Sequence, residues 1–160
     1  MRKEMIGPGI GQFASVPQFL PYGPGEWVMM SDLTLNGVMI VPKYFITDFA
    51  SIPWVVQPIF NSLDMLLEFI PHDWAYCLNE KSRADCDNLL SDIMERSKPG
   101  DVRCDLIYAG VRAGGWYRYG QCKGGPKRED FAWELMSDYE VLLYESAYKL
   151  GSNHAASSAQ

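Results

Sequence analysis

The chain has 160 residues, with 14 Lys and Arg against 20 Asp and Glu, so its formal net charge is −6. This length favours one compact domain over two. Hydrophobic residues make up 48% of the chain and charged residues 21%, a composition that excludes a disordered protein. Because phosphate contacts need clustered cations, the acidic balance argues against binding to duplex nucleic acid or to an anionic membrane surface.

No apolar run reaches the length of a membrane span, and the N-terminal residues lack the pattern of a signal peptide. The four cysteines form no Cys-x-x-Cys pair, which excludes the zinc-ribbon and thioredoxin patterns. A free cysteine among apolar neighbours behaves as a small hydrophobic residue. We therefore expect no membrane span and reduced thiols in a cytosolic compartment.

The first half of the chain predicts a small antiparallel sheet of three or four strands. Residues 1–25 hold much of the Pro and Gly, which predicts an extended arm or turns rather than regular structure. Residues 27–30 and 44–47 have the composition of short strands. Between them, Asn36-Gly37 separates two apolar runs and predicts a hairpin with a type I′ turn, in which both central residues have positive φ.

The second half predicts helices. Pro53 suits the first turn of a short helix, residues 62–69 have a helical pattern, and Pro71 interrupts it before a helix over 72–79. Ser82 opens a helix to about residue 96, Asp101 caps one to about 117, and Asp130 starts the longest, to about 150. The expected fold is α+β: a sheet packed by about four helices in one domain over 26–150, between an arm over 1–25 and a flexible tail over 151–160.

One acidic residue falls on an apolar helix face. At about 100° per residue, Asp87 lies on the stripe of Leu90, whereas Asp85 and Asp92 project from the opposite side. A buried carboxylate needs a partner, and Arg83 lies one turn before Asp87. The sequence therefore predicts a buried Asp87 paired with Arg83.

Two further segments allow both a chemical and a structural interpretation. Asp48 and Ser51 are either ligands of a pocket or turn and cap residues before Pro53. His72 beside Asp73 is either a general base or metal ligand next to a carboxylate, or a histidine with an internal hydrogen bond next to an acid that caps a helix.

These segments also carry a resemblance. The run Thr47-Asp48-Phe49-Ala50-Ser51-Ile52-Pro53, then His72-Asp73-x-x-Tyr76, Arg83-x-x-x-Asp87 and Ile107-Tyr108-Ala109-Gly110-Val111-Arg112-Ala113-Gly114-Gly115 occur in this order. They resemble the signature of a phage and prophage family catalogued as domain of unknown function 1353, over residues 38–116. The family implies a phage or prophage origin and no settled activity. The chain departs from the pattern by placing Pro71 directly before His72.

The inventory of side chains limits the possible chemistry. Only His72 and His154 are histidines, and HExxH is absent, which argues against a familiar zinc hydrolase. One divalent metal ion held by Asp48, His72 and Asp87 stays open, as does acid–base catalysis by Asp48, His72, Asp73 and Asp87. The alternative is a buried polar network in which Ser51, Tyr76, Arg83 and Arg112 join these acids.

Two functions follow. The first is a structural or accessory component of a phage particle, in the tail or neck, that docks on other particle proteins. It would be made in the host cytoplasm and then enter the virion. The alternative is a small phage hydrolase that acts on the cell envelope through the Asp/His/Asp site. The first has the support of the aromatic composition and of arms at both ends of the chain.

Overall fold

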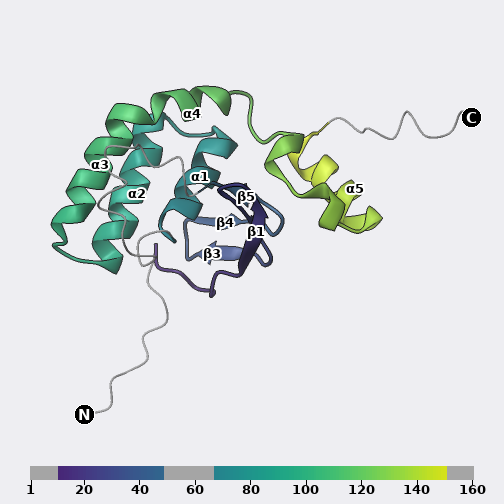
Figure 1. The fold of residues 1–160 in the computed structure, drawn as a ribbon, viewed down its shortest axis with the longest axis horizontal. Coiled ribbons are helices and arrows are strands. Elements are labelled where there is room, and N and C mark those ends of the chain that lie inside the picture. Colours follow the sequence, from purple (N-terminus) through teal and green to yellow (C-terminus); the bar gives the residue numbers. More distant parts are fainter. Residues whose placement is uncertain (1–10, 49–66, 151–160) are drawn as a thin grey trace, which may run out of the picture.

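The computed structural model describes residues 11–48 and 67–150 of the chain. Strands precede helices, which confirms the α+β fold expected from the sequence. Figure 1 shows α2 and α3 on one side of the strands and α5 on the other, with α1 against the strands. The described residues contain five strands: β1 (Phe19–Gly23), β2 (Glu26–Met29), β3 (Leu33–Leu35), β4 (Met39–Val41) and β5 (Ile46–Thr47).

The strands form two small antiparallel units within the described residues. One has the order β1-β2-β5, and the other is the hairpin β3-β4. The expectation of no regular structure in residues 1–25 is wrong for β1, because its backbone pairs with β2, from Phe19 opposite Met29 onward. Pro21 is tolerated there because β1 is an edge strand, where a missing N–H breaks no ladder on the open side.

The predicted hairpin is present, but its turn is not of type I′. Leu35 pairs with Met39, so three residues form the loop, and Val38 N–H donates to Leu35 C=O at 3.0 Å. In this loop only Gly37 has a positive φ, of 68°. Asn36 is not left-handed, and a type I′ turn needs both central residues in that region.

The helices of the described residues are α1 (Phe69–Leu78), α2 (Arg83–Ser97), α3 (Val102–Gly114), α4 (Trp116–Gln121) and α5 (Asp138–Tyr148). The prediction that Pro71 interrupts a helix is wrong, because Pro71 lies inside α1. It is the third residue of the helix, where the N–H has no intrahelical partner to lose. Ser82 and Asp101 cap α2 and α3 as predicted, since their side chains accept backbone N–H groups of the first turn.

The longest predicted helix, from Asp130 to about residue 150, is wrong at its start. The Asp130 carboxylate accepts from Lys127 N–H and closes a 3-10 turn, and Phe131 is extended and bridges to Phe45. A second 3-10 turn, Trp133–Leu135, follows. The helix begins only after Ser137, which forms a capping box with Glu140. The longest described helix is therefore α2, with 15 residues.

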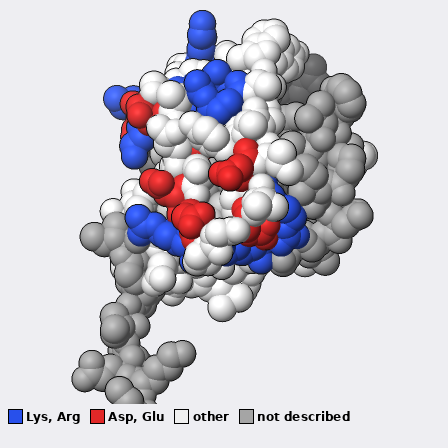
Figure 2. Space-filling view, turned by 90° about the vertical axis from the view of Figure 1, so that its left-hand side faces the viewer, with Lys and Arg blue, Asp and Glu red and all other residues white. Residues whose placement is uncertain are grey.

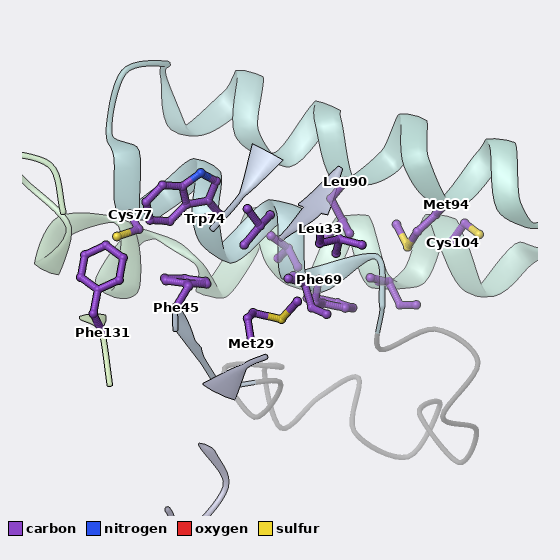
Figure 3. Packing of buried hydrophobic residues seen from close by; sticks show 14 residues of the cluster. Met29, Leu33, Phe45, Phe69, Trp74, Cys77, Leu90, Met94, Cys104 and Phe131 are labelled. Carbon is purple, nitrogen blue, oxygen red and sulfur yellow. The ribbon is translucent and has the colours of Figure 1, made fainter. Parts of the chain in front are cut away.

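The hydrophobic core runs along α1 and α2 over the strands (Figure 3). Phe45, Trp74 and Phe131 form its aromatic end, and Met94 and Cys104 lie at the other end. The predicted short helix at Pro53, the pattern over 62–66, Ser51 and the tail over 151–160 lie outside the described residues.

Candidate functional site

The centre of the polar site is the carboxylate of Asp87, which is 0% exposed. Its Oδ1 accepts a hydrogen bond from the Tyr76 hydroxyl at 2.5 Å and lies 3.0 Å from Nε2 of His72. Its Oδ2 accepts from Arg112 Nη1 at 2.6 Å and from Arg83 Nη1 at 3.5 Å. Both oxygens of a buried charge are thus occupied by donors, which is the arrangement such a charge requires.

Three helices bring these groups together. On α1, His72 and Tyr76 are one turn apart and share a face, with ring centroids 4.2 Å apart. Asp87 projects from α2 toward them, and Arg112 reaches it from the last turn of α3. The Arg83 guanidinium also donates to the Arg112 carbonyl at 2.9 Å, so α2 and the end of α3 are joined twice.

Close approach of the backbone completes the cluster. A Cβ placed on Gly115, between α3 and α4, would lie 2.5 Å from the Tyr76 hydroxyl oxygen and 2.8 Å from the Val111 carbonyl oxygen. Neither distance is possible for a real side chain, so Gly115 is the residue that lets Tyr76 reach Asp87. In the sequence this glycine stands out only as the last residue of the motif that begins at Ile107.

The electrostatics of the cluster favour an ionised Asp87. Burial raises the pKa of this carboxyl, but the hydrogen bonds from His72, Tyr76 and Arg112 outweigh burial and hold the pKa below its usual value. Burial, followed by the hydrogen bond to Asp87, raises the pKa of Tyr76. Tyr76 therefore stays a neutral donor and Asp87 stays a charged acceptor.

His72 links this cluster to a second acid. Because ionised Asp87 only accepts hydrogen bonds, Nε2 of His72 carries the proton between them. The other ring nitrogen, Nδ1, is buried and has no hydrogen-bond partner among the described residues. It lies 3.9 Å from Oδ1 of Asp73, too far for a hydrogen bond. Burial lowers the pKa of His72, but the two carboxylates, Asp73 and Asp87, together raise it above its ordinary value.

Asp73 also accepts a hydrogen bond from the strand side of the site. The Thr47 hydroxyl, in β5, donates to its Oδ2 at 2.6 Å. A small cavity of about 20 Å³ lies beside His72 and Asp73. Such a volume has room for about one water molecule and not for a substrate.

Arg118, in α4, borders that cavity and was not predicted as a site residue. It also borders a hollow of about 220 Å³ lined by Asp48 and Asp130. Burial opposes its charge, but nearby Cys122, Asp48 and Asp73 raise the pKa of its guanidinium. No local signal could have found Arg118, because Asp48 and Asp73 come from distant parts of the chain.

The predicted site residues thus divide into groups. His72, Tyr76, Arg83, Asp87 and Arg112 meet, and Asp73 lies at the edge of that cluster. Asp48 instead lines the neighbouring hollow with Arg118, while Ser51 lies outside the described residues.

The positions of these side chains bear on the predicted metal site. Within residues 11–48 and 67–150, no three His, Cys, Asp or Glu side chains are placed to hold one metal ion. Asp87 already uses both oxygens for donors from His72, Tyr76 and two arginines. A metal role for Asp48, His72 and Asp87 stays a prediction from the sequence.

The four cysteines, Cys77, Cys86, Cys104 and Cys122, are free and buried. Burial raises the pKa of the Cys86 thiol to about 11, so it remains protonated at neutral pH. In the described part of the chain, no helix has the length and hydrophobicity needed to span a membrane.

None of the curated proteins and none of the solved structures compared with this chain matches it. One protein family does match, over residues 26–111, and its description is "protein of unknown function (DUF1353)". The matched region runs from β2 to the last turn of α3 and contains His72, Tyr76, Arg83 and Asp87. Since the match covers more than half of the 160 residues, the chain belongs to this family.

Proposed function

We propose that the protein is a structural or accessory component of a phage or prophage-encoded particle, in the tail or neck region. In this role it docks on other particle proteins, first in the host cytoplasm and then in the virion. The phage part of the proposal rests on the motif resemblance over residues 38–116. The docking part rests on one observation, an exposed apolar surface on α3 and α4.

This surface, the α3–α4 patch, consists of Val102, Leu106, Trp116 and Tyr117. Val102 and Leu106 are one turn apart on α3, on the face opposite the buried Ile107 and Val111. Trp116 and Tyr117 open α4, where they are 66% and 62% exposed. Exposed Ala109 and Ala113 continue the stripe of α3 between the two ends of the patch.

Large exposed aromatic residues favour a protein partner. Trp and Tyr are enriched at interfaces, where they supply contact area with little loss of side-chain freedom. Trp116 and Tyr117 already pack edge to face with each other, with centroids 6.0 Å apart. Figure 2 shows acidic and basic side chains close together on the face that it views, without the single-sign surface that a polyanion would select.

The polar cluster around Asp87 also supports a structural role. Asp87 is fully buried and fully hydrogen-bonded, and the adjoining cavity of about 20 Å³ is too small for an envelope polymer. A carboxylate with every lone pair occupied orients helices and holds no free position for a reacting group.

The direct experiment is mass spectrometry of purified particles from the phage or prophage that encodes the chain. The proposal expects the protein at a fixed copy number per particle. Particles made with the double variant L106S/W116S should contain at least ten-fold less of it, because both changes remove apolar contact area. The melting temperature of the purified double variant should stay close to that of the wild type, since both side chains are exposed.

The matched control is Ile40→Ser, at an apolar residue of β4 that is 57% exposed and lies outside both the patch and the N-terminal arm. It should enter particles as the wild type does. Absence of the wild-type chain from particles would overturn the proposal, as would equal incorporation of L106S/W116S and I40S.

A second candidate, an envelope hydrolase, is favoured by one specific observation. Nδ1 of His72 is buried beside Asp73 and has no hydrogen-bond partner in the described part of the chain, while Nε2 is oriented by Asp87. A histidine held by a carboxylate through one ring nitrogen presents the other as a general base. In this alternative His72 and Asp73 act on the substrate, and Asp87 is a positioning residue.

The two candidates separate in an assay of purified cell envelope with the wild-type protein. The assembly role predicts no release of soluble fragments. Fragment release that His72→Gln abolishes at unchanged melting temperature would replace the assembly role by the hydrolase. Release that persists in His72→Gln would indicate a contaminating enzyme and leave the particle experiment to decide.

A further inference from the structure

The outward face of α5 combines apolar, small and charged residues in a particular order. Tyr139, Leu142 and Leu143 are 69%, 55% and 47% exposed. They occupy the first two turns, and exposed Ser146 and Ala147 occupy the next turn on the same side. Figure 1 shows α5 on the far side of the strands from α2 and α3, so this face is separate from the α3–α4 patch.

The inward face of α5 is already engaged. Tyr144 and Tyr148 pack against Phe131, with centroids 5.3 and 5.1 Å away. Two of the three acids in α5 also have partners on the inward side. Glu140 accepts from the Tyr44 hydroxyl at 2.9 Å, and Glu145 pairs with Arg128 at 2.8 Å. The outward face therefore carries no charge between its two ends.

Those ends have opposite charges. Asp138 opens the helix and Lys149 caps it, and both are exposed. Neither side chain makes a hydrogen bond or ion pair with another described residue. From its N-terminal to its C-terminal end, the face thus carries an acid, then large apolar side chains, then small side chains, then a base.

We propose that this face binds a second copy of the chain, with the two α5 helices antiparallel about a two-fold axis near Leu143. A two-fold axis makes each half of a surface meet the other half, so the surface must be complementary to itself. With the axis near the middle of the helix, Asp138 lies opposite Lys149 of the second copy. Tyr139 then lies opposite the small Ala147, and Leu142 and Leu143 meet their counterparts at the centre.

A parallel pair would not give this match. It would set Tyr139 against Tyr139, Asp138 against Asp138 and Lys149 against Lys149. In the antiparallel arrangement the positive N-terminal end of each helix dipole also lies beside the negative C-terminal end of the other. A single pair of helices with 11 residues each buries less than the roughly 1,600 Å² of a standard interface, so we expect a reversible dimer.

Sedimentation equilibrium of the full chain, from about 10 µM to about 500 µM, tests this inference. The wild type should change from monomer to dimer over this range. Leu142→Glu should remain monomeric, because it places two carboxylates near the two-fold axis. Ile40→Glu is the matched control, since it introduces the same charge at an apolar residue of β4 that is 57% exposed and lies outside both α5 and the α3–α4 patch. It should dimerise as the wild type does.

A charge exchange tests the antiparallel register. Asp138→Lys and Lys149→Glu should each weaken the dimer at least five-fold, because each sets like charges opposite one another. The double variant D138K/K149E should restore the wild-type affinity. Both changes oppose the dipole of α5, so the double variant should melt below either single variant even as its dimer returns. A mere loss of helix stability cannot produce that combination.

A wild type that remains monomeric throughout the range overturns the inference, as does a loss of dimer in Ile40→Glu. Failure of D138K/K149E to restore association excludes the antiparallel register. The proposed particle role does not depend on these results, because it concerns the α3–α4 patch and is measured by incorporation into particles.

Discussion

At the junction of α1, α2 and α3 the contacts are hydrogen bonds to a buried charge, whereas at the junction of α5 with the strands they are contacts between aromatic rings. In the first, Asp87 accepts from four side chains on three helices, with donor distances from 2.5 to 3.5 Å. In the second, the ring centroid of Phe131 lies within 6.0 Å of the ring centroids of Trp74, Tyr144 and Tyr148.

The two junctions should respond differently to the loss of one group. Removing a carboxylate from a buried network leaves its partners charged or polar with no acceptor, and the cost is large for few atoms. Removing a ring from an aromatic cluster loses contact area and leaves a cavity, without unpaired polar groups. The charged junction fixes one geometry, and the aromatic junction mainly contributes buried area.

Asp87→Ala should have the largest effect, with a loss of about 4 kcal/mol in the free energy of unfolding, because His72 and Arg112 lose their buried acceptor. Urea unfolding of the purified variant measures this loss. Asp92→Ala, on the exposed side of the same helix, should change the free energy by less than about 0.5 kcal/mol. Similar losses in both variants would show that Asp87 is not the centre of the junction.

Phe131→Ala should cost about 3 kcal/mol, because it removes a 2% exposed ring from the centre of the aromatic cluster. The same urea titration measures it. Phe131→Leu keeps much of the volume and should cost less than half as much. If the leucine and alanine variants were equally destabilised, the loss would not arise from cavity formation.

Gly115→Ala should cost about 2 kcal/mol, because the new Cβ overlaps the Tyr76 hydroxyl and the Val111 carbonyl. Gly120→Ala is the control within α4, since its Cβ would meet no atom of the described residues within 4 Å. This control should be neutral or slightly stabilising, because alanine favours helix more than glycine does. Thermal unfolding of both variants distinguishes crowding at Tyr76 from a general effect of replacing glycine.

The smallest effect should be the pH dependence that His72 contributes. Its pKa is raised on folding, so its stabilisation is complete below the unfolded value of about 6.5 and is lost as pH rises through the folded value. The wild type should therefore lose stability from about pH 6 to about pH 7.5, a range that lies above the titration of carboxyl groups and below the value of about 8.5 for an unfolded thiol. His72→Gln should be nearly flat over this range. A wild-type stability that rises with pH would mean that His72 is buried in its neutral form.

The sequence supported much of the Asp87 cluster because its signals are local. Helical periodicity placed Asp87 on an apolar face, with Arg83 one turn away, and the structure buries Asp87 completely. Arg112 is the closer arginine, and periodicity within α2 could not show this because the contact joins different helices.

The errors also have physical causes. Asp130 and Ser137 are both possible N-caps of the last helix. The helix begins after Ser137, which forms a capping box with Glu140, whereas Asp130 closes a 3-10 turn. β1 was missed because Pro and Gly disfavour strands, although an edge strand tolerates them. Arg118 was missed because only the tertiary fold brings it near Asp48 and Asp73.

Amide hydrogen exchange of Phe131→Ala tests most directly whether the two junctions are independent. If they are, α5 loses more protection than α1, α2 and α3, because the Asp87 cluster that joins those three helices is intact. Equal loss of protection in α5 and in the three other helices would contradict the account, because it would show that charge and aromatic packing stabilise a single cooperative unit.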